Sequence, residues 1–216
     1  CSSVTVTNDA PAAFPLGTTT VTWTAVDASG NTTTATQLVT VRDVELPTIT
    51  APTAVNVNTN TACTATGVTL GTPVTADNCS VASVTNNAPT AFPLGTTTVT
   101  WTVVDGSGNT ATATQIVTVT DATLPTVITQ NITVQLNANG QATITAANVN
   151  NGSFDNCAVN TLVVSPASFD CSNVGPNTVT LTVTDVNGNV NTGTAIVTVV
   201  DAIAPVVNTR NITVTL

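Results

Sequence analysis

Apolar and polar residues alternate along most of the chain, in short runs separated by turn-forming residues. Residues 96–104, TTTVTWTVV, place Val99, Trp101 and Val103 on one face of an extended strand and Thr residues on the other. Residues 105–109, DGSGN, predict a tight turn, because Gly and Asn tolerate positive φ. The same hairpin pattern recurs at 19–42 and 178–200. No segment of useful length has a helical period, so the pattern predicts an all-β fold.

The hairpin belongs to a longer internal repeat. Residues 1–43 and 79–121 align without a gap at an offset of 78 and are identical at 33 of 43 positions. A diverged third copy ends with residues 177–201, NTVTLTVTDVNGNVNTGTAIVTVVD, and a fourth begins at Asp201. Repetition at this length predicts an array of small domains rather than one large core.

A proline marks each boundary between repeats. It stands four residues after an Asp that closes a Val/Thr run, and Pro cannot continue a strand ladder. The three boundary pairs are Asp43 with Pro47, Asp121 with Pro125, and Asp201 with Pro205. We therefore expect the C-terminal half of a first repeat at 1–43, complete second and third repeats at 44–121 and 122–201, and the first strand of a fourth at 202–216. The expected fold is a set of tandem immunoglobulin-like or fibronectin-like β-sandwich repeats in an elongated array, with Trp23 and Trp101 in their cores.

Composition narrows the function. β-branched Thr and Val dominate, and the net charge is −9, with Arg42 and Arg210 the only basic residues. Phosphate neutralisation needs clustered basic side chains, so nucleic-acid binding is not expected. No apolar run is long enough to span a bilayer. The absence of His and Lys removes the common general bases, and we expect no catalytic residues and no enzyme activity.

Five cysteines predict disulfides and an oxidising, extracellular location. We expect Cys63 to bond Cys79 and Cys157 to bond Cys171, each closing a loop of about 15 residues that stabilises by about 3 kcal/mol. Cys1 is the equivalent of Cys79 under the repeat offset, so its partner is expected upstream of the chain. A thiolate metal site is the weaker alternative, because CxxC pairs and His are missing.

Three motifs together resemble a known module. They are Asp-Asn-Cys at 77–79, FPLGTTTVTWTVVDGSGN at 92–109 and VTVTD at 117–121, and they look like the hyalin-repeat (HYR) domain. The third repeat resembles the variant found in tandem in very large secreted surface adhesins of Bacteroidetes, of the gliding-motility SprB type. This resemblance implies an immunoglobulin-like fold, cell-surface placement, a role in adhesion or as a scaffold, and export by the type IX secretion system.

Acidic residues recur at three positions of the repeat: the end of the last strand, the Asp-Asn-Cys loop and the hairpin turn. In an immunoglobulin-like topology these positions meet where one repeat follows another, and converging carboxylates are what Ca²⁺ requires. The candidate ligands are Asp43, Asp77 and Asp105 at one junction and Asp121, Asp155 and Asp185 at the next. The alternative is turn chemistry alone, because Asp and Asn side chains also satisfy local backbone N–H groups.

The favoured function is structural. Neighbouring repeats of the same chain would be the partners, and together they would hold an adhesive tip away from the cell. A second hypothesis is that the repeats themselves bind surface polysaccharide or other filament strands. Exposed aromatic residues would favour it, whereas the few aromatics here stand in apolar contexts. A third is a stalk of a secreted hydrolase.

Overall fold

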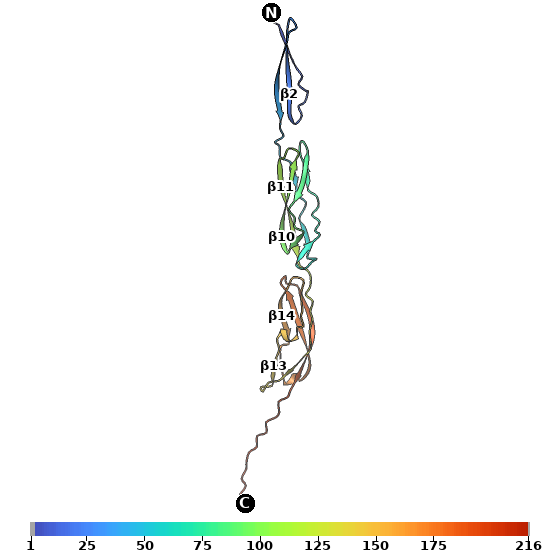
Figure 1. Ribbon diagram of the computed structural model, residues 1–216. Helices are drawn as coiled ribbons and strands as arrows, with labels where there is room; N and C mark the ends of the chain where they lie inside the picture. Colours follow the sequence, from blue (N-terminus) through green and yellow to red (C-terminus); the bar gives the residue numbers. More distant parts are fainter. Residues whose placement is uncertain (1–2, 216) are drawn as a thin grey trace. The chain divides into compact units, whose positions relative to one another are not determined.

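The computed structural model describes residues 3–215, and nearly all of its regular structure is β-strand (Figure 1). The described residues form two compact units. Unit 1 comprises residues 3–55, 69–89 and 98–116; unit 2 comprises residues 56–68, 90–97 and 117–215. The expected all-β, repeated sandwich fold is confirmed. The boundaries proposed for the repeats stay a prediction.

The N-terminal segment forms a three-stranded antiparallel sheet in unit 1. Its order is β1–β2–β3, with strands β1 (Val4–Asn8), β2 (Gly17–Asp27) and β3 (Thr32–Val41). The turn after β2 is an Asx turn in which the Asp27 carboxylate accepts the backbone N–H of Ser29 and Asn31. Val21 is buried, whereas Trp23 is 38% exposed. The expectation that Trp23 is a core residue is therefore wrong in this structure.

The second repeat supplies a four-stranded sheet and two strand pairs. The sheet has the order β5–β11–β10–β8, with strands β5 (Val55–Asn58), β11 (Thr110–Thr120), β10 (Gly95–Asp105) and β8 (Val81–Asn86). The pairs are β4 (Thr48–Thr50) with β7 (Val74–Ala76), and β6 (Thr64–Thr66) with β9 (Ala91–Pro93). Val99, Trp101 and Val103 are buried, which confirms the predicted face.

Trp101 is 6% exposed, and its burial depends on a glutamine. Its indole N–H donates to Gln115 Oε1 at 3.0 Å. The Gln115 amide in turn donates to the carbonyls of Thr53 and Leu70 at 2.8 Å each. In the N-terminal sheet Trp23 donates to Gln37 in the same way, at 2.9 Å. Residues 3–43 contain no counterpart of Thr53 or Leu70, so this tryptophan stays partly exposed.

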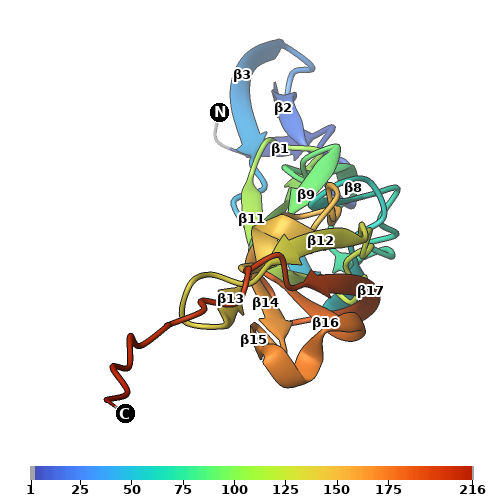
Figure 2. The same ribbon diagram turned by 90° about the horizontal axis from the view of Figure 1, so that it is seen from below.

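Residues 122–201, the predicted third repeat, lie wholly in unit 2. Its main sheet has the order β12–β17–β16–β14, with strands β12 (Ile132–Gln135), β17 (Val190–Val200), β16 (Gly175–Asp185) and β14 (Val159–Ser165). A second sheet pairs β13 (Gln141–Thr143) with β15 (Ser168–Asp170) (Figure 2). Two single turns complete it: the helix α1 (Ala146–Val149) and the 3-10 turn η1 (Cys171–Asn173).

The core of the third repeat lies between these two sheets. Val179, Leu181 and Val183 alternate along β16 with no exposed surface, and they pack in one cluster with Ala142 of β13 and Phe169 of β15. Full burial of one such side chain stabilises by about 1.5–3 kcal/mol. Residues 201–215 form no strand, although they restate the sequence of 121–135, where β12 pairs with β17. A strand needs a partner, and none is present for 201–215 among the described residues.

Candidate metal centres

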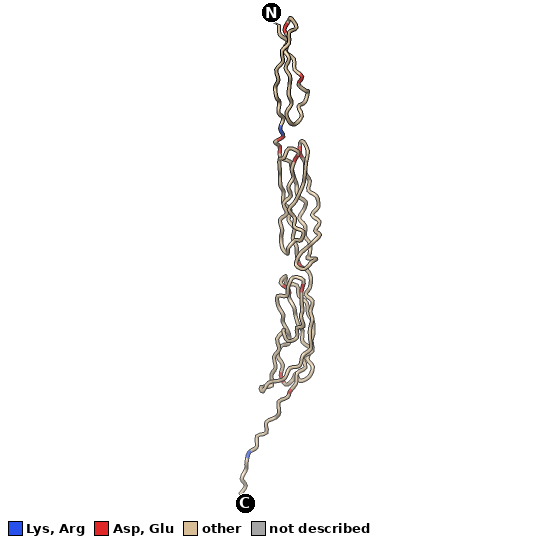
Figure 3. Tube along the Cα trace, viewed as in Figure 1, with Lys and Arg blue, Asp and Glu red and all other residues tan. Residues whose placement is uncertain are grey.

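Acidic residues lie mainly at strand ends and in loops rather than along the strands, as the red positions on the Cα trace show (Figure 3). The structure brings together two groups whose oxygen or sulfur atoms lie within 4.8 Å of one another. The first cluster is Asp43, Asp77 and Asp105, all in unit 1. The second cluster is Asp121, Asp155 and Cys157, all in unit 2. Both combine the strand-final Asp with the Asp of the Asp-Asn-Cys loop.

Local hydrogen bonds hold the first cluster in place. Asp43 follows β3, and its Oδ1 accepts the backbone N–H of Glu45 at 3.1 Å. Asp77 opens the loop after β7, and its Oδ2 accepts the N–H groups of Cys79 and Ser80, both at 2.9 Å. These Asx turns follow from the ability of a short carboxylate to satisfy backbone N–H groups two or three residues on.

Asp105 ends β10 and is 2% exposed. Its carboxylate accepts the N–H groups of Ser107 and Asn109, and also the Asn109 side-chain amide at 2.6 Å. Burial raises the pKa of Asp105, but the hydrogen bonds from Asn109, Ser107 and Gly108 outweigh it, so that the net pKa is lowered. Asn109 also donates to the Asp43 carbonyl at 3.4 Å, which ties the hairpin turn to the end of β3.

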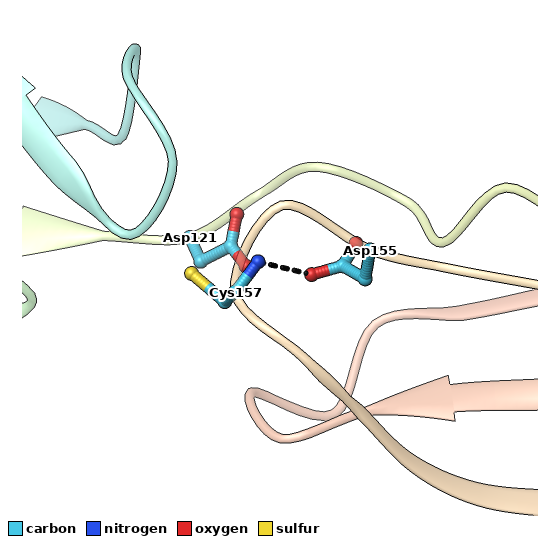
Figure 4. A group of neighbouring side chains, drawn as sticks. All are labelled: Asp121, Asp155 and Cys157. Atoms are coloured by element: carbon cyan, nitrogen blue, oxygen red, sulfur yellow. Dashed lines mark hydrogen bonds between the residues drawn. The ribbon is translucent and has the colours of Figure 1, made fainter.

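The second cluster repeats this arrangement around Asp121, which follows β11 (Figure 4). Asp121 Oδ1 accepts the backbone N–H of Thr123 at 3.1 Å and the hydroxyl of Thr59 at 3.1 Å. Asp155 Oδ2 accepts the N–H of Cys157 at 2.8 Å, as Asp77 does for Cys79. Asn156 donates to Asp121 Oδ1 at 3.3 Å and to the Ala62 carbonyl at 3.1 Å, so this loop bridges two segments that are far apart in sequence.

The two clusters leave the same oxygens without a hydrogen-bond partner. Asp43 Oδ2 and Asp77 Oδ1 in the first cluster, and Asp121 Oδ2 and Asp155 Oδ1 in the second, are buried and unpartnered among the described residues. Asn156 Oδ1 is a fifth such atom. Buried carboxylate oxygens are costly unless they are paired or coordinate a cation. Carboxylate oxygens within 4.8 Å of one another are close enough to share one ion with bonds of about 2.4 Å. The first cluster offers three carboxylates and the second offers two, because the Cys157 sulfur is bonded to Cys63.

Asp185 is the predicted ligand that the second group does not contain. It is fully buried, and its oxygens accept the N–H groups of Asn187 and Asn189 and the Asn189 amide, all at 2.8 Å. Burial raises the pKa of Asp185, and these hydrogen bonds outweigh it and lower the net pKa. Its turn still reaches the cluster, because Asn189 donates to the Asp121 carbonyl at 3.2 Å.

The cysteine pairing predicted from the sequence is wrong. Cys63 bonds Cys157, with their Cα atoms 4.6 Å apart, whereas Cys79 and Cys171 are free and exposed. The prediction assumed that each bridge closes a local loop. Instead Cys63 belongs to unit 2 and Cys79 to unit 1, and Cys171 lies beside Gly140 rather than in the Asp155 loop. Cys1 lies outside the described residues.

The loop cysteine of the first cluster is a thiol rather than half of a bridge. Partial desolvation raises the pKa of the Cys79 thiol, and the neighbouring Asp43, Asp77 and Asp105 carboxylates raise it further. The thiol therefore stays mainly protonated at neutral pH and is a poor metal ligand. This agrees with carboxylate oxygens, not sulfur, as the candidate ligands of the first cluster.

Sequence reasoning missed three contributors: Asn109, Asn156 and Asn189. Each follows an Asp of the site at a fixed spacing, Asp-Asn in the loop and Asp-x-x-x-Asn in the turn. That spacing was a detectable signal. Their contacts to Asp43, Ala62 and Asp121 could not be predicted, because these contacts depend on how the segments pack.

Among residues 3–215 no helix is both long and apolar enough to cross a membrane.

Comparison with known proteins points to one family. The profile of the HYR domain matches residues 1–41 and 42–119. Hyalin of Strongylocentrotus purpuratus is 33% identical over 94% of this chain and 18% of its own length. Hyalin of Lytechinus variegatus is 33% identical over 92% of this chain and 40% of its own length. The chain thus spans well under half the length of these curated relatives.

Among solved structures, Drosophila N-cadherin EC1-4 aligns with a TM-score of 0.41 and 12% identity, over 86% of this chain and 58% of that one. Human mucin-like protocadherin EC1-2 aligns with a TM-score of 0.43 and 15% identity, over 72% of this chain and 98% of that one. Neither similarity is close enough to support a conclusion.

Proposed function

The chain belongs to the HYR-domain family, and on that premise we propose that it is a structural segment of a secreted, cell-surface adhesion protein. Its repeats act as spacers that carry an adhesive tip away from the cell. Ca²⁺ ions and covalent bridges hold one repeat to the next, so mechanical reach rather than catalysis is the output. In this proposal the repeats are 1–43, 44–121, 122–201 and 202–216, and they stack into an elongated array.

The observation that carries the proposal is the recurrence of the buried, unpartnered carboxylate oxygens in both clusters. In each cluster one carboxylate follows the last strand of a repeat and the other begins the Asp-Asn-Cys loop of the next. Asp43, Asp77 and Asp105 would hold one ion, and Asp121 and Asp155 the other, with Asn156 Oδ1 as a further oxygen. A bound Ca²⁺ would remove the repulsion between these carboxylates and join the two repeats.

Calorimetric titration of the chelator-treated chain with Ca²⁺ tests this proposal. Two sites per chain are expected, together with a higher unfolding temperature, because an ion that binds only the folded state stabilises it. Asp201→Asn is the matched control. Asp201 makes the same turn as Asp43 and Asp121, through the backbone N–H of Ile203, and belongs to neither cluster. An unfolding temperature and a heat signal that Ca²⁺ leaves unchanged would reduce both clusters to turn chemistry.

An extracellular location is supported by the Cys63–Cys157 bridge, because such bonds persist outside the reducing cytosol. Labelling of intact cells with an antibody to this chain, before and after external protease treatment, tests it. Signal detected only after cells are permeabilised would contradict surface placement.

Two further functions stay open to test. Direct binding of surface polysaccharide is the first alternative, and the burial of Trp101 counts against it. A glycan array probed with the chain separates a binder from a spacer, since a pure spacer gives no specific signal. The stalk of a secreted hydrolase is the other alternative, and the sequence on either side of these repeats decides it.

The narrowest form of the proposal is a very large Bacteroidetes adhesin of the gliding-motility SprB type, exported by the type IX secretion system. The resemblance of the third repeat to that variant supports it. Deletion of the encoding gene should then abolish surface spreading without slowing growth. Normal spreading would confine the role to static adhesion.

A further inference from the structure

The Cys63–Cys157 disulfide joins the predicted second and third repeats rather than closing a loop within one of them. Cys63 directly precedes β6 of the second repeat, and Cys157 ends the Asp-Asn-Cys loop of the third. The two cysteines of the bridge therefore occupy different positions within their repeats. One half belongs to the β6–β9 end of a repeat, and the other to the Asp-Asn-Cys loop of the repeat that follows.

The third repeat has a β6–β9 equivalent that lacks the corresponding cysteine. Strand β13 pairs with β15 as β6 pairs with β9: Ala142 lies opposite Phe169, and Ala65 lies opposite Phe92. When Ala142 is matched to Ala65 in these two strand pairs, Gly140, which directly precedes β13, takes the position of Cys63. A glycine has no thiol to offer, so this strand pair cannot supply its half of a bridge from the same position.

Cys171 takes the place of the missing side chain. It directly follows β15, so it is the cross-strand neighbour of Gly140 at the end of the pair. Its Sγ lies 2.8 Å from the point where a Cβ on Gly140 would stand, and 3.8 Å from the Gly140 carbonyl oxygen. The second repeat has Leu94 directly after β9. The thiol is thus presented at the same end of the sandwich from the opposite loop, and it is exposed.

Cys79 is the complementary half. Its loop has the geometry of the bonded loop, because Asp77 accepts its N–H at 2.9 Å as Asp155 accepts that of Cys157 at 2.8 Å. Cys79 is exposed and lines a surface pocket of about 280 Å³ together with Leu16 and Asn78. Leu16 follows Phe14-Pro15 of the first repeat, as Leu94 follows Phe92-Pro93, so this pocket lies at the end of the repeat that should carry the partner thiol.

We infer that Cys79 and Cys171 are open halves of inter-repeat disulfides, and that the Asp-Asn-Cys cysteine of each repeat bonds the cysteine at the β6–β9 end of the repeat before it. The bridge forms by thiol–disulfide exchange with a small disulfide such as oxidised glutathione: the two protein thiols are oxidised to a cystine, and the oxidant is reduced to two thiols that take up the protons. This inference does not rest on cation binding.

A chain extended with its own sequence tests the inference. Residues 44–78 placed before residue 1 complete the first repeat and add a copy of Cys63. Residues 137–201 placed after residue 216 complete a fourth repeat and add a copy of Cys157. After refolding with reduced and oxidised glutathione, peptide mapping without reduction should join the added Cys63 to Cys79, and Cys171 to the added Cys157. A bond from the added Cys63 to Cys1, or free Cys79 and Cys171, would overturn the inference.

A second variant keeps the test decisive if an added repeat fails to fold. In the existing chain, Pro15 and Leu16 are replaced by the five residues of the third repeat from Asp170 to Val174, which brings the turn with its cysteine to the pocket beside Cys79. Alkylation of the native protein should then leave Cys79 unmodified, whereas in the parent chain Cys79 reacts. The same graft with serine in place of the cysteine is the control, and continued alkylation of Cys79 in the cysteine graft would count against the inference.

Discussion

The first and second clusters are built on the same Asp-Asn-Cys loop, yet only one of the two loop cysteines is bonded. Asp77 and Asp155 make matching hydrogen bonds to their loops, and each leaves the same carboxylate oxygen buried and unpartnered. Cys157 is bonded to Cys63, and Cys79 is a free, exposed thiol. The loop therefore presents a cysteine in both clusters, but only Cys157 has a bonded partner among the described residues.

This difference separates two ways of joining repeats. Carboxylates are present in both clusters, so a bound ion can join the segments at each of them. A covalent bridge requires a thiol at the right end of the neighbouring repeat, and residues 3–43 contain none. The second cluster should accordingly survive conditions that disrupt the first.

Removing the bridge should have the largest effect. The bond spans 94 residues, and in the chain-entropy model a loop of that length stabilises by about 4–5 kcal/mol. The double variant Cys63→Ser/Cys157→Ser should lose about that free energy of unfolding in urea, measured by tryptophan fluorescence and circular dichroism. Cys79→Ser and Cys171→Ser should be close to neutral, because both side chains are exposed. Equal losses in all variants would remove the contrast between the clusters.

Breaking one cluster at a time should halve Ca²⁺ binding. Asp77→Ala should remove the site of the first cluster, and Asp155→Ala that of the second, so that calorimetry counts one site in place of two. Occupancy at 100 times the dissociation constant stabilises by about 2.7 kcal/mol, which sets the expected loss for the affected unit. Two unchanged sites in either variant would show that the cluster in question holds no ion.

Two hairpin turns allow a comparison of a buried and an exposed aspartate, neither of which belongs to a cluster. Asp185 and Asp27 make the same hydrogen bonds within the same five-residue turn, but Asp185 is fully buried and Asp27 is exposed. Asp185→Asn turns an amide toward the Asn189 amide and leaves buried donors unpaired, so about 1–3 kcal/mol should be lost. Asp27→Asn should cost much less in the same urea titration, because the Asp27 side chain is exposed. Equal costs would mean that burial of the turn contributes nothing.

Lowering the pH should have the smallest effect on the stability of the folded chain. The pKa values of Asp105 and Asp185 are lowered in the folded chain. Their contribution to stability is therefore complete above the unfolded value of about 3.9 and is lost as pH falls through the lower folded value. In chelator buffer the unfolding temperature should be flat from pH 7 to about 5 and should fall below about pH 4. Asp185→Asn should make that fall shallower, and an unchanged slope would contradict the assignment.

Much of the local structure was predictable from periodicity. The alternation of Val99, Trp101 and Val103 predicted a buried face, and the structure confirms it. The same letters mislead at Trp23, whose strand differs from β10 at one position of eleven. An alternating pattern predicts which residues share a face. It does not predict whether another layer covers that face.

The sequence predicted that these carboxylates lie together, but it did not predict every residue of the two clusters. The recurring Asp positions identified Asp43, Asp77 and Asp105, and also Asp121 and Asp155, as carboxylates that meet. The placement of Asp185 outside the second group, and the bridging role of Asn156, depend on side-chain packing that no repeat pattern encodes.

The strands, the turns, the repeat and the loop that presents each Asp and Cys could be read from the chain alone, because each depends on residues close together in the sequence. Which cysteines meet depends on packing, since Cys63 and Cys157 are bonded although they are 94 residues apart in the sequence, and Cys79 and Cys171 are free. Periodicity reports the position of a residue within its repeat. A bond between repeats depends on which end of a sandwich that position occupies, and packing alone determines that.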